Sequence, residues 1–364
     1  MCVSQNTGNY LMSEKIRILN VMESLGIGGG QIMMFELSNG INKYFGDRYD
    51  SIVAGIKKDS SAVVVQSKLL ETYGIPVLKI SYCDLNNYCI QNKIDIVVHH
   101  RISISSPIKS YLPKQTKYIV VSHTAASLGR IRDFYQYADY VVSVCNNLLK
   151  CSPFLKNKIS FDRLPVILNG IENDFVKDVQ PMKIRGNFIS GRCHRLVPTK
   201  FSLESLAMFE KRKAEIGGHV HYLLGTGNKA LPAAAKGKDS IEYIGEVTDK
   251  ILKYRYLKSF DVYYYEIFSN EGASIAVLES LSCGIPVICL NKGGIRELVV
   301  NGVNGFIEKD RNGMIKRLAS LRRDKKLLES MKETTRKHFD DKLHIRHCAK
   351  KYICLFERLM SKNG

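Results

Sequence analysis

The chain has 364 residues, more than one hydrophobic core usually serves, so two domains are expected. Its 45% hydrophobic and 24% charged residues exclude a disordered or fibrous chain. The 54 Lys and Arg residues outnumber the 35 Asp and Glu residues, and the formal net charge of +19 indicates an anionic partner: a nucleic acid, an anionic membrane or a phosphorylated substrate, unless the basic surface is merely solvated.

Residues 1–14 are interpreted as an N-terminal extension. They lack the basic-then-apolar order of a secretory signal, and no run in the chain approaches the roughly 18 to 20 apolar residues of a membrane span. The ten cysteines form no C-x-x-C unit, and several lie in apolar runs, which favours a reducing compartment. We expect a cytoplasmic protein and leave open a peripheral contact with an anionic membrane.

Residues 15–177 alternate short β-branched runs with longer helical patterns, as in βαβ units. Their near-continuous apolar strands indicate a parallel sheet covered on both faces. The expected strands are IRILNVME (16–23), DSIVAGI (50–56), IPVLKI (75–80), IDIVVHH (94–100), KYIVVSH (117–123) and YVVSV (140–144); the expected helices are QIMMFELSNGINKYF (31–45), AVVVQSKLLETYG (62–74), DLNNYCIQNK (84–93) and one before Tyr137.

The pattern breaks at 176–187, a polar segment that we interpret as the interdomain linker. Residues 178–340 restart the βαβ pattern and predict a second open α/β domain. The expected strands are NFISGR (187–192), HVHYLLG (219–225), IEYIG (241–245), DVYYY (261–265), PVICL (286–290) and NGFIEKD (304–310); the expected helices are SLESLAMFEKRK (202–213), DKILKYRYLKSF (249–260) and SIAVLESLS (274–282).

The tail from Asn312 onward is basic and predicts helix. Its last part, 341–364, is expected to be one helix, because apolar residues repeat there at threes and fours. These apolar residues are Ile345, Cys348, Tyr352, Leu355 and Leu359.

Two doubly wound domains in series place their ligand clefts at the carboxyl ends of their strands, so facing domains would enclose a ligand. SLGIGGGQ follows the first strand and opens a helix, where glycine lets the backbone approach an anion. A dinucleotide fingerprint needs a small residue where Gln31 stands, which counts against a dehydrogenase. A tight turn without a ligand is the alternative. The glycines are Gly26, Gly28, Gly29 and Gly30.

Two further strand ends carry cations or glycines. In SGRCHRLVPTK, Arg195 and Lys200 flank a proline turn and suit a diphosphate, Arg by its fork and Lys as a point charge. Basic residues before a helix are also common without a ligand. In LLGTGN, Gly225 and Gly227 follow another strand at the edge where ligands bind, and an ordinary turn is the alternative.

NEGASIAVLESLSCGIP joins two strands and predicts a helix beginning at Ala273 or Ser274. Glu271 then lies in the loop before the helix and Glu279 on its second turn. A loop carboxylate can reach sugar hydroxyls, a helical one can bind a ribose, and the first-turn N–H groups would face phosphate between them. A capping acid with a surface glutamate is the alternative.

Histidines end two strands: His99 and His100 end one, and His123 ends another. We place them at the cleft edge and favour His123 as the functional one. A satisfied polar residue at a strand end is the alternative.

Together these residues resemble glycosyltransferase family 4, retaining enzymes with the two-domain GT-B fold that use nucleotide-diphosphate sugars. The resemblance covers about Ile16 to Phe306. Its most specific part is the E-x7-E signature from Glu271 to Glu279, followed by CGIPV. RLVPTK, the first glycine loop, NGIE and GGIRELVVNGVNGF support it.

The resemblance implies that Arg195 and Lys200 neutralise the leaving diphosphate and that Glu271 holds the donor sugar. Glu279 would bind the ribose, and His123 would line the sugar pocket. In the GT-B fold the C-terminal helix crosses back to the first domain. The other implied binding positions present backbone to the phosphates, lie beside the base or line the cleft: Gly29, Gly30, Gly225, Val247, Gly272, Ala273, Ser274 and Ile275.

The chain departs from the family pattern at three places. Gln31 stands where an acidic residue is common, and Ala273 and Ser274 replace the usual Phe-Gly. These two changes bear on the choice of acceptor and donor sugar. His194 replaces the glycine often found before Arg195.

The resemblance also implies that no metal or other cofactor is required, because the cations and the helix N-terminus take the leaving-group charge. The sequence holds no D-x-D triplet. Retention by front-face attack, in which the departing phosphate oxygen takes the acceptor's proton, needs no protein nucleophile.

We therefore expect a retaining glycosyltransferase that moves a sugar from a UDP- or GDP-sugar to a hydroxyl of a glycan or lipid-linked acceptor, as in polysaccharide biosynthesis. One alternative is a catalytically inert homologue that binds a nucleotide sugar or a protein partner. Only the net charge supports a nucleic-acid binder. The sequence contains no recognised module in which basic and aromatic residues alternate, so no nucleic-acid partner is expected.

Overall fold

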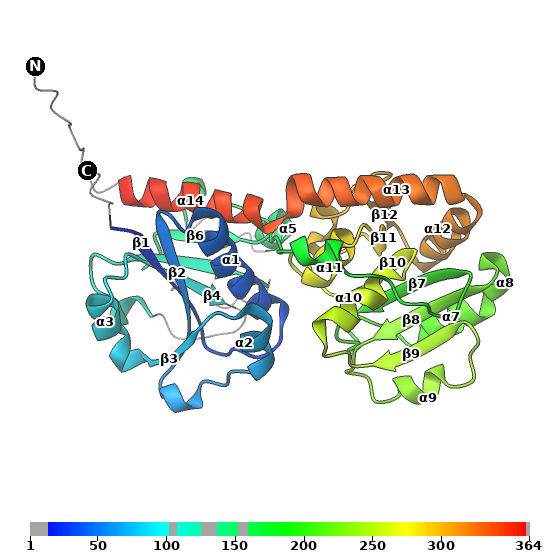
Figure 1. Cartoon of the computed structure of the whole chain (residues 1–364), viewed down its shortest axis with the longest axis horizontal. Helices are drawn as coiled ribbons and strands as arrows, with labels where there is room; N and C mark the ends of the chain where they lie inside the picture. The colour runs from blue at the N-terminus through cyan, green and yellow to red at the C-terminus, as the bar shows by residue number, and fades with distance from the viewer. Residues whose placement is uncertain (1–13, 102–107, 125–136, 152–158, 362–364) are drawn as a thin grey trace, which may run out of the picture.

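The computed structural model describes residues 14–101, 108–124, 137–151 and 159–361. Two domains lie side by side, each built on a six-stranded parallel sheet with helices packed on it (Figure 1). The predicted fold class, two doubly wound α/β domains, is confirmed.

The first sheet has the strand order β3-β2-β1-β4-β5-β6, so the chain starts in the middle, runs to one edge and returns to add β4 beside β1. The carboxyl ends of β1 and β4 flank the point where the strand order reverses, which is where such sheets bind ligands. The strands are β1 Ile16–Met22, β2 Tyr49–Lys57, β3 Val77–Ser81, β4 Ile96–Arg101, β5 Lys117–Ser122 and β6 Tyr140–Ser143.

Helices of the first domain follow these strands, and apolar residues of the strands fill the space beneath them. In β5, five of the six residues are buried, which is typical of a strand covered on both faces. The helices are α1 Gly29–Phe45, α2 Ser67–Tyr73, α3 Tyr82–Gln91 and α5 Asn146–Lys150, with short turns η1 Ser60–Ala62, η2 Lys109–Tyr111, η4 Phe161–Arg163 and η5 Asp174–Lys177.

The second sheet repeats this plan with the order β12-β11-β10-β7-β8-β9. Its order reverses between β7 and β10, so the loops that follow these two neighbouring strands lie together at the ligand edge. The strands are β7 Phe188–Cys193, β8 His219–Leu224, β9 Ile241–Gly245, β10 Val262–Tyr265, β11 Val287–Leu290 and β12 Gly305–Glu308.

The helices of the second domain include α11, which follows β10 and begins at the reversal point. The helices are α7 Glu204–Lys211, α8 Lys213–Ile216, α9 Leu231–Ala235, α10 Lys250–Lys258, α11 Ile275–Ser282, η6 Gly293–Glu297 and α12 Arg311–Arg323.

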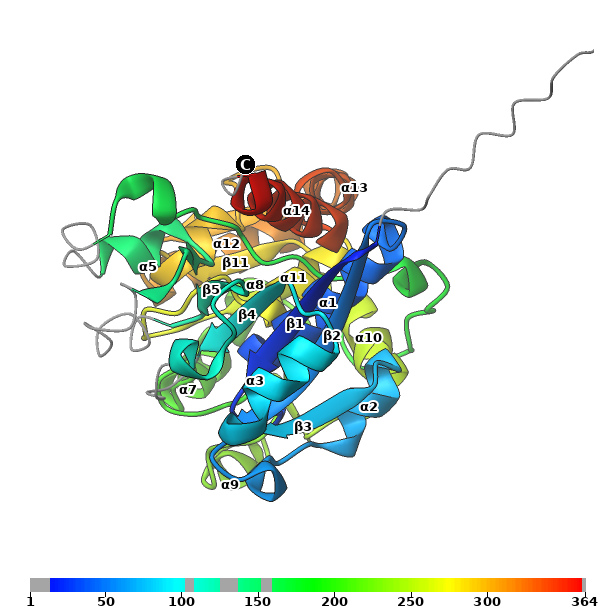
Figure 2. The ribbon, with the colours of Figure 1, turned by 90° about the vertical axis from the view of Figure 1, so that its left-hand side faces the viewer.

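The C-terminal segment runs along one edge of both domains as α13 (Lys325–His338), η7 (Phe339–Leu343) and α14 (Ile345–Ser361) (Figures 1 and 2). The apolar stripe predicted for the last helix is buried and packs on the first domain. A Cβ added to Gly40 of α1 would lie 2.6 Å from Ile345 Cγ1, so glycine permits this close approach. The C-terminal helix therefore crosses back, as the resemblance implied.

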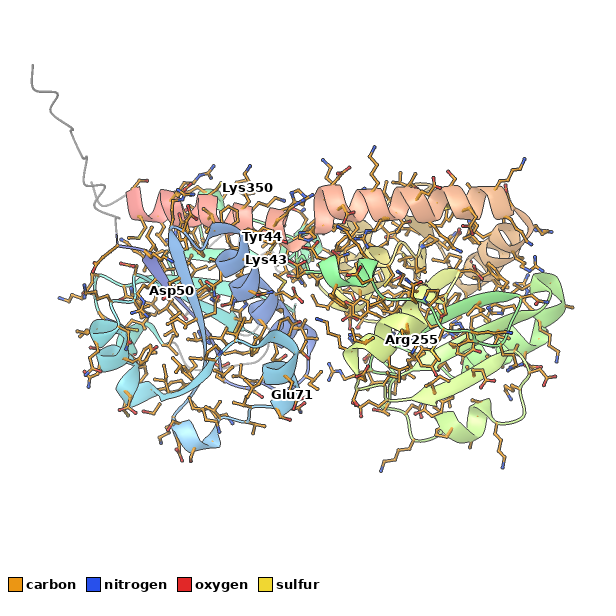
Figure 3. The ribbon with its side chains drawn as sticks, viewed as in Figure 1. Lys43, Tyr44, Asp50, Glu71, Arg255 and Lys350 are labelled. Atoms are coloured by element: carbon orange, nitrogen blue, oxygen red, sulfur yellow. The ribbon has the colours of Figure 1, made fainter. Side chains whose placement is uncertain are left out.

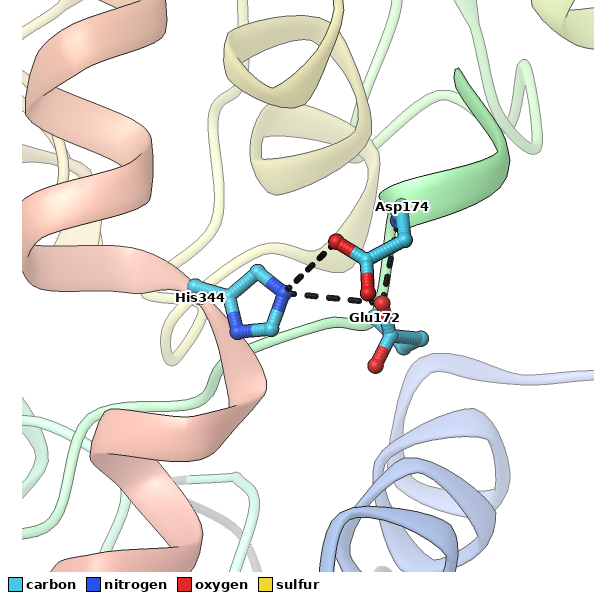
Figure 4. Close-up of side chains that lie close together, drawn as sticks. All are labelled: Glu172, Asp174 and His344. Carbon is cyan, nitrogen blue, oxygen red and sulfur yellow. Dashed lines mark hydrogen bonds and ion pairs between the residues drawn. The ribbon is translucent and has the colours of Figure 1, made fainter. Parts of the chain in front are cut away.

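Glu172 and Asp174, just before the linker, meet His344 (Figure 4) beside Lys43 and Tyr44 of α1 (Figure 3). Lys43 Nζ lies 3.0 Å from Glu172 Oε2 and 2.8 Å from Asp174 Oδ2, and the Tyr44 hydroxyl donates to Glu172 at 2.7 Å. Burial raises the pKa of the Glu172 carboxyl, but contacts with His344 and the Asp174 amide outweigh it and lower that pKa far below its usual range. Because Lys43 supplies the positive charge, we interpret the cluster as a structural contact that fixes the segment before the linker to α1 and to the C-terminal segment.

Two expected elements differ from the structure or lie outside it. The helix expected over 62–74 begins only at Ser67, because three successive β-branched valines precede it and Val65 forms an isolated parallel bridge with Leu25. The helix expected before Tyr137 lies outside the described residues. Among the described residues, no helix combines the length and the apolar character that crossing a bilayer requires.

Candidate functional site

The first-domain glycine loop lies against the start of α11. A Cβ added to Gly29 would lie 3.6 Å from Ile275 Cγ1, an ordinary contact across the domain boundary. Gln31, which sequence analysis found at an unexpected place, is buried and donates from Nε2 to the Ser24 carbonyl at 3.1 Å, which closes the loop. Gly30 is buried in the first turn of α1. Two predicted binding segments from different domains are thus brought together.

The N-terminus of α11 carries no side-chain cap. Ser274 occupies the cap position with extended backbone, and its hydroxyl lies 2.9 Å from the Tyr265 hydroxyl instead of bonding a first-turn amide. The carbonyl of Ala273 accepts a hydrogen bond from Asn169 Nδ2 at 2.8 Å. An uncapped helix start offers its N–H groups and partial positive charge to an anion. Residues 273–275 therefore form an uncapped helix N-terminus next to Asn169.

Lys200 and Glu271 form an ion pair at this helix start. Lys200 Nζ lies 2.5 Å from Glu271 Oε1, and the two side chains are 22% and 19% exposed. The Tyr265 hydroxyl oxygen lies 2.9 Å from Glu271 Oε2 and 2.9 Å from the Ser274 hydroxyl. Because the Tyr265 hydroxyl has one hydrogen, it donates to the Glu271 carboxylate and accepts from Ser274. Burial and the nearby carboxylate raise the pKa of Tyr265 well above its usual value, so it stays a donor.

Gly272 brings the loop of Glu271 against the first domain. A Cβ added there would lie 2.9 Å from the His123 carbonyl oxygen and 2.8 Å from Val144 Cγ2, and Thr124 forms an antiparallel bridge with Glu271. Glycine is needed for this approach. The loop before α11 is thereby fixed at the domain boundary.

Arg195 is exposed, and its guanidinium forms no hydrogen bond or ion pair with another described residue. Its loop is held by the neighbouring one: Gly225 has φ +131°, and a Cβ there would lie 2.0 Å from the His194 carbonyl oxygen. Gly227, with φ +132°, packs in the same way on Val197. These two glycines position the loop and leave the Arg195 side chain free for a ligand.

Glu279 lies on the second turn of α11, and its side chain is 11% exposed. Lys253 Nζ of α10 donates to Glu279 Oε1 at 2.7 Å. One carboxylate oxygen is therefore occupied by the ammonium group. The alternative of a surface glutamate is excluded, because the Glu279 side chain is buried against a cation.

Glu279 and Val247 line a pocket of about 140 Å³ between the domains. The second domain contributes the loop after β9 and part of α10, and the first domain contributes α1 and α2. Both carboxylates and ammonium groups face this pocket, so it suits a polar ligand with some apolar surface. The lining residues are Ile27, Ile32, Glu36, Thr72, Tyr73, Ile171, Glu246, Val247, Thr248, Asp249, Lys250, Lys253, Tyr254 and Glu279.

Glu36 is the first-domain carboxylate of this pocket. Its Oε1 accepts from the Tyr73 hydroxyl at 2.8 Å and its Oε2 accepts from the Glu172 amide at 2.7 Å. Burial raises the pKa of the Glu36 carboxyl to about 7, against the lowering effect of these hydrogen bonds. Glu36 thus connects α1, α2 and the backbone of Glu172 beside the pocket.

Replacing Glu36 with glutamine is expected to flatten the pH dependence of stability between about pH 4.5 and 7. The folded protein keeps the Glu36 proton up to about pH 7, whereas the unfolded chain loses it near 4.5. The folded state therefore binds more protons in this window, and stability falls as pH rises through it. Thermal melting of both proteins across this pH window should show that the melting temperature of the variant rises relative to that of the wild type as the pH rises. A constant difference in melting temperature would contradict the assignment.

The three histidines lie deeper than expected. His99 and His100 are fully buried, and His123 is 8% exposed. His123 Nε2 lies 3.1 Å from His100 Nδ1, and burial lowers the pKa of His123 to about 4 and that of His100 well below its usual value. The placement of His99 and His100 at the cleft edge is corrected, because both side chains are fully buried: the His99 ring contacts Tyr118 and Glu23, and the His100 ring contacts Asn20 and His123. His123 meets the cleft through its backbone carbonyl beside Gly272.

A larger hollow, about 630 Å³, lies on the second domain between α7 and the start of α12. None of the predicted site residues lines it. Two of its cations are already paired, Arg212 with Glu215 and Arg311 with Glu204 and Glu266. We therefore place the candidate site at the domain boundary, where charges and backbone amides converge.

Three groups of the site were not predicted from the sequence: Tyr265, Lys253 and Glu36. Tyr265 ends a predicted strand at the ligand edge, so its position could have identified it. Lys253 and Glu36 lie in helical patterns among many similar residues, and only the packing of α10 and α1 against the pocket distinguishes them.

Comparison with known proteins finds similarity to glycosyltransferases. Residues 203–338 match the family model of glycosyl transferases group 1. An uncharacterized glycosyltransferase of Methanocaldococcus jannaschii is 23% identical over 251 residues, which cover 65% of this chain and 62% of that protein. The chain thus spans less than two thirds of this curated relative.

Two solved structures share the fold over nearly the whole chain. HepE of Anabaena, solved with UDP, superposes with a TM-score of 0.69 at 16% identity, and the match covers 95% of this chain and 100% of the HepE chain. HepE was also solved with UDP-glucose. A glycosyltransferase of Rickettsia africae has a TM-score of 0.74 at 16% identity, with 95% and 99% covered. The likeness to these structures shows the GT-B fold, and with the family match over 203–338 it supports a GT-B glycosyltransferase.

Proposed function

We propose that this protein is a retaining glycosyltransferase that transfers a sugar from a nucleotide-diphosphate sugar to a hydroxyl of a glycan or lipid-linked acceptor. The observation that carries the proposal is the Lys200–Glu271 pair, 2.5 Å apart, beside the uncapped N-terminus of α11. A cation, a carboxylate and free helix amides at one point suit a sugar joined to a diphosphate.

In this proposal the donor lies along α11. The nucleoside occupies the interdomain pocket, with the base beside Val247 and the ribose on Glu279. The diphosphate lies at the helix N-terminus between Arg195 and Lys200, and the sugar reaches Glu271. The UDP complexes of HepE support a nucleotide-sugar donor, and the net charge of +19 suits both this donor and an anionic membrane surface near the acceptor.

The proposed reaction keeps the anomeric configuration. The bond between the sugar's anomeric carbon and the phosphate oxygen breaks, and the acceptor oxygen bonds that carbon on the same face. The acceptor's proton passes to the departing phosphate oxygen, so atoms and charge balance without a protein nucleophile. Arg195, Lys200 and the α11 amides stabilise the charge on the diphosphate, and the proposal routes no step through a metal.

A thermal-shift screen against UDP-, GDP- and ADP-sugars tests the proposal. A donor present at about 100 times its dissociation constant should stabilise the protein by about 2.7 kcal/mol. Incubation with that donor should then release its nucleoside diphosphate, by hydrolysis or transfer, and Glu271→Ala should abolish this release. No stabilisation by any of the three sugars would refute the donor site. Binding without release across many acceptors would favour the alternative, an inert homologue that binds a nucleotide sugar.

A further inference from the structure

Arg192 is a fully buried cation at the end of β7, one loop away from the proposed diphosphate site. Its Nε and Nη2 lie 2.8 and 2.5 Å from His194 Nε2, and its Nη2 also donates to the carbonyls of Lys200 and Glu266 at 2.6 and 2.8 Å. Among the described residues no carboxylate accepts from it, and Nη1 has no partner. A buried charge without a paired carboxylate lowers the stability of the folded state unless other contacts compensate for it.

The contact with Arg192 fixes the tautomer of His194. A guanidinium only donates, so His194 Nε2 must accept and the ring's proton must lie on Nδ1. Nδ1 lies 2.7 Å from the Arg195 carbonyl oxygen and therefore donates to it. Burial and the neighbouring Arg192 charge lower the pKa of His194 well below its usual value, which keeps the ring neutral. Arg192 thus reaches the backbone of Arg195 through His194.

The Arg192 guanidinium contacts three segments of the proposed site, directly or through His194. It holds Lys200 directly by the carbonyl, Arg195 through His194, and the start of the loop to Glu271 through the Glu266 carbonyl. The planar fork of arginine can serve several acceptors in fixed directions, which a lysine ammonium cannot. Arg195 and Lys200, the proposed phosphate-binding residues, therefore lie at the two ends of a loop, and Arg192 fixes the backbone at both ends.

We propose that Arg192 and His194 are positioning residues that preorganise the Arg195–Lys200 loop for the donor diphosphate. The inference rests on the proposed donor site. His194, where the family resemblance would place glycine, is on this view the link that lets Arg192 act on Arg195. Fixing the loop before the ligand arrives lowers the ordering cost of binding.

The test compares His194→Phe with His194→Gln. Phenylalanine keeps the ring beside Tyr265 but neither accepts from Arg192 nor donates to Arg195. Glutamine can do both. Calorimetric titration with UDP should show about tenfold weaker binding in His194→Phe, equal to about 1.4 kcal/mol. Binding of UMP, which lacks the second phosphate, should change less, and His194→Gln should recover most of the UDP affinity. GDP and GMP replace these probes if the wild type prefers guanine.

Hydrogen exchange of the free protein separates this inference from the proposed function. The amides of Lys200 and Phe201 bond the Val197 carbonyl at 2.8 and 2.9 Å, and they should exchange faster in His194→Phe and in Arg192→Lys than in the wild type. Arg317→Gln, which removes an ion pair to Glu308 on the same domain, is the control for general destabilisation and should leave them unchanged.

The outcomes are distinct. Unchanged exchange in His194→Phe and Arg192→Lys, or equal losses of UDP and UMP affinity in His194→Phe, would overturn the positioning role. A wild type that binds neither UDP nor GDP would instead refute the donor site, whatever the exchange rates show.

Discussion

Replacing Lys200 with methionine is expected to lower kcat/KM for the nucleotide sugar by about 10²- to 10³-fold, the usual cost of removing one group that stabilises developing charge. Methionine keeps most of the length of the side chain but not its charge. The Glu271 carboxylate, 2.5 Å from Lys200 Nζ, then loses its cation and repels the arriving diphosphate. Steady-state kinetics with the donor found in the thermal-shift screen measure the effect.

Lys236→Met is the matched control, because Lys236 is exposed on the same domain and lines the hollow beside α9 instead of the domain boundary. It removes the same charge from the chain and should leave kcat/KM nearly unchanged. Lys200→Arg should recover part of the loss, since it keeps a cation near Glu271. Equal losses in Lys200→Met and Lys236→Met would mean that net charge, and no local site, carries the effect.

The fold could be predicted because its strands are continuous apolar runs. Buried parallel strands must be apolar on both faces, so runs such as the one ending at His123 stand out without any knowledge of their neighbours. The helical pattern misled at 62–74, because the predicted helix included three valines that lie before its observed start at Ser67. There β-branching and the bridge from Val65 to Leu25 prevail over the pattern.

The candidate site could be predicted residue by residue but not as a set of contacts. Glu271 and Lys200 were each chosen for their own motif, and their ion pair depends on β7 lying beside β10, which only the sheet order reveals. The buried His99 and His100 were misplaced for a related reason. Sequence places a histidine at a strand end, but the fold decides whether its ring points to the cleft or bonds inside the sheet.

The role of Arg192 could not be predicted, because the sequence does not show which groups it contacts. A charged residue in the strand FISGRC was visible, yet its acceptors are two backbone carbonyls and a histidine ring, none of which can be inferred from residue types. The sequence therefore predicts that Arg195 and Lys200 bind the diphosphate, but not that the Arg192 guanidinium holds their loop.

Replacing Glu279 with glutamine is expected to weaken nucleotide binding and to destabilise the protein. Losing a hydrogen bond to a charged group costs about 1.5–3 kcal/mol, so the dissociation constant of the nucleotide should rise about 10- to 100-fold. The variant also leaves the Lys253 ammonium, 2.7 Å from Glu279, without its carboxylate. Breaking a fully buried pair costs about 3–5 kcal/mol. Since Lys253 is 21% exposed, the loss in unfolding free energy should be smaller.

The double variant Lys253→Met, Glu279→Gln separates the two roles of Glu279. Removing both charges takes away the unpaired ammonium, so the double variant should regain stability over Glu279→Gln alone. Its nucleotide binding should stay weak, because no carboxylate remains for the ribose. Chemical unfolding and calorimetric titration of the three proteins measure both quantities. A double variant that binds nucleotide as well as the wild type would mean that Glu279 serves only to neutralise Lys253, and the ribose would then need another partner in the pocket.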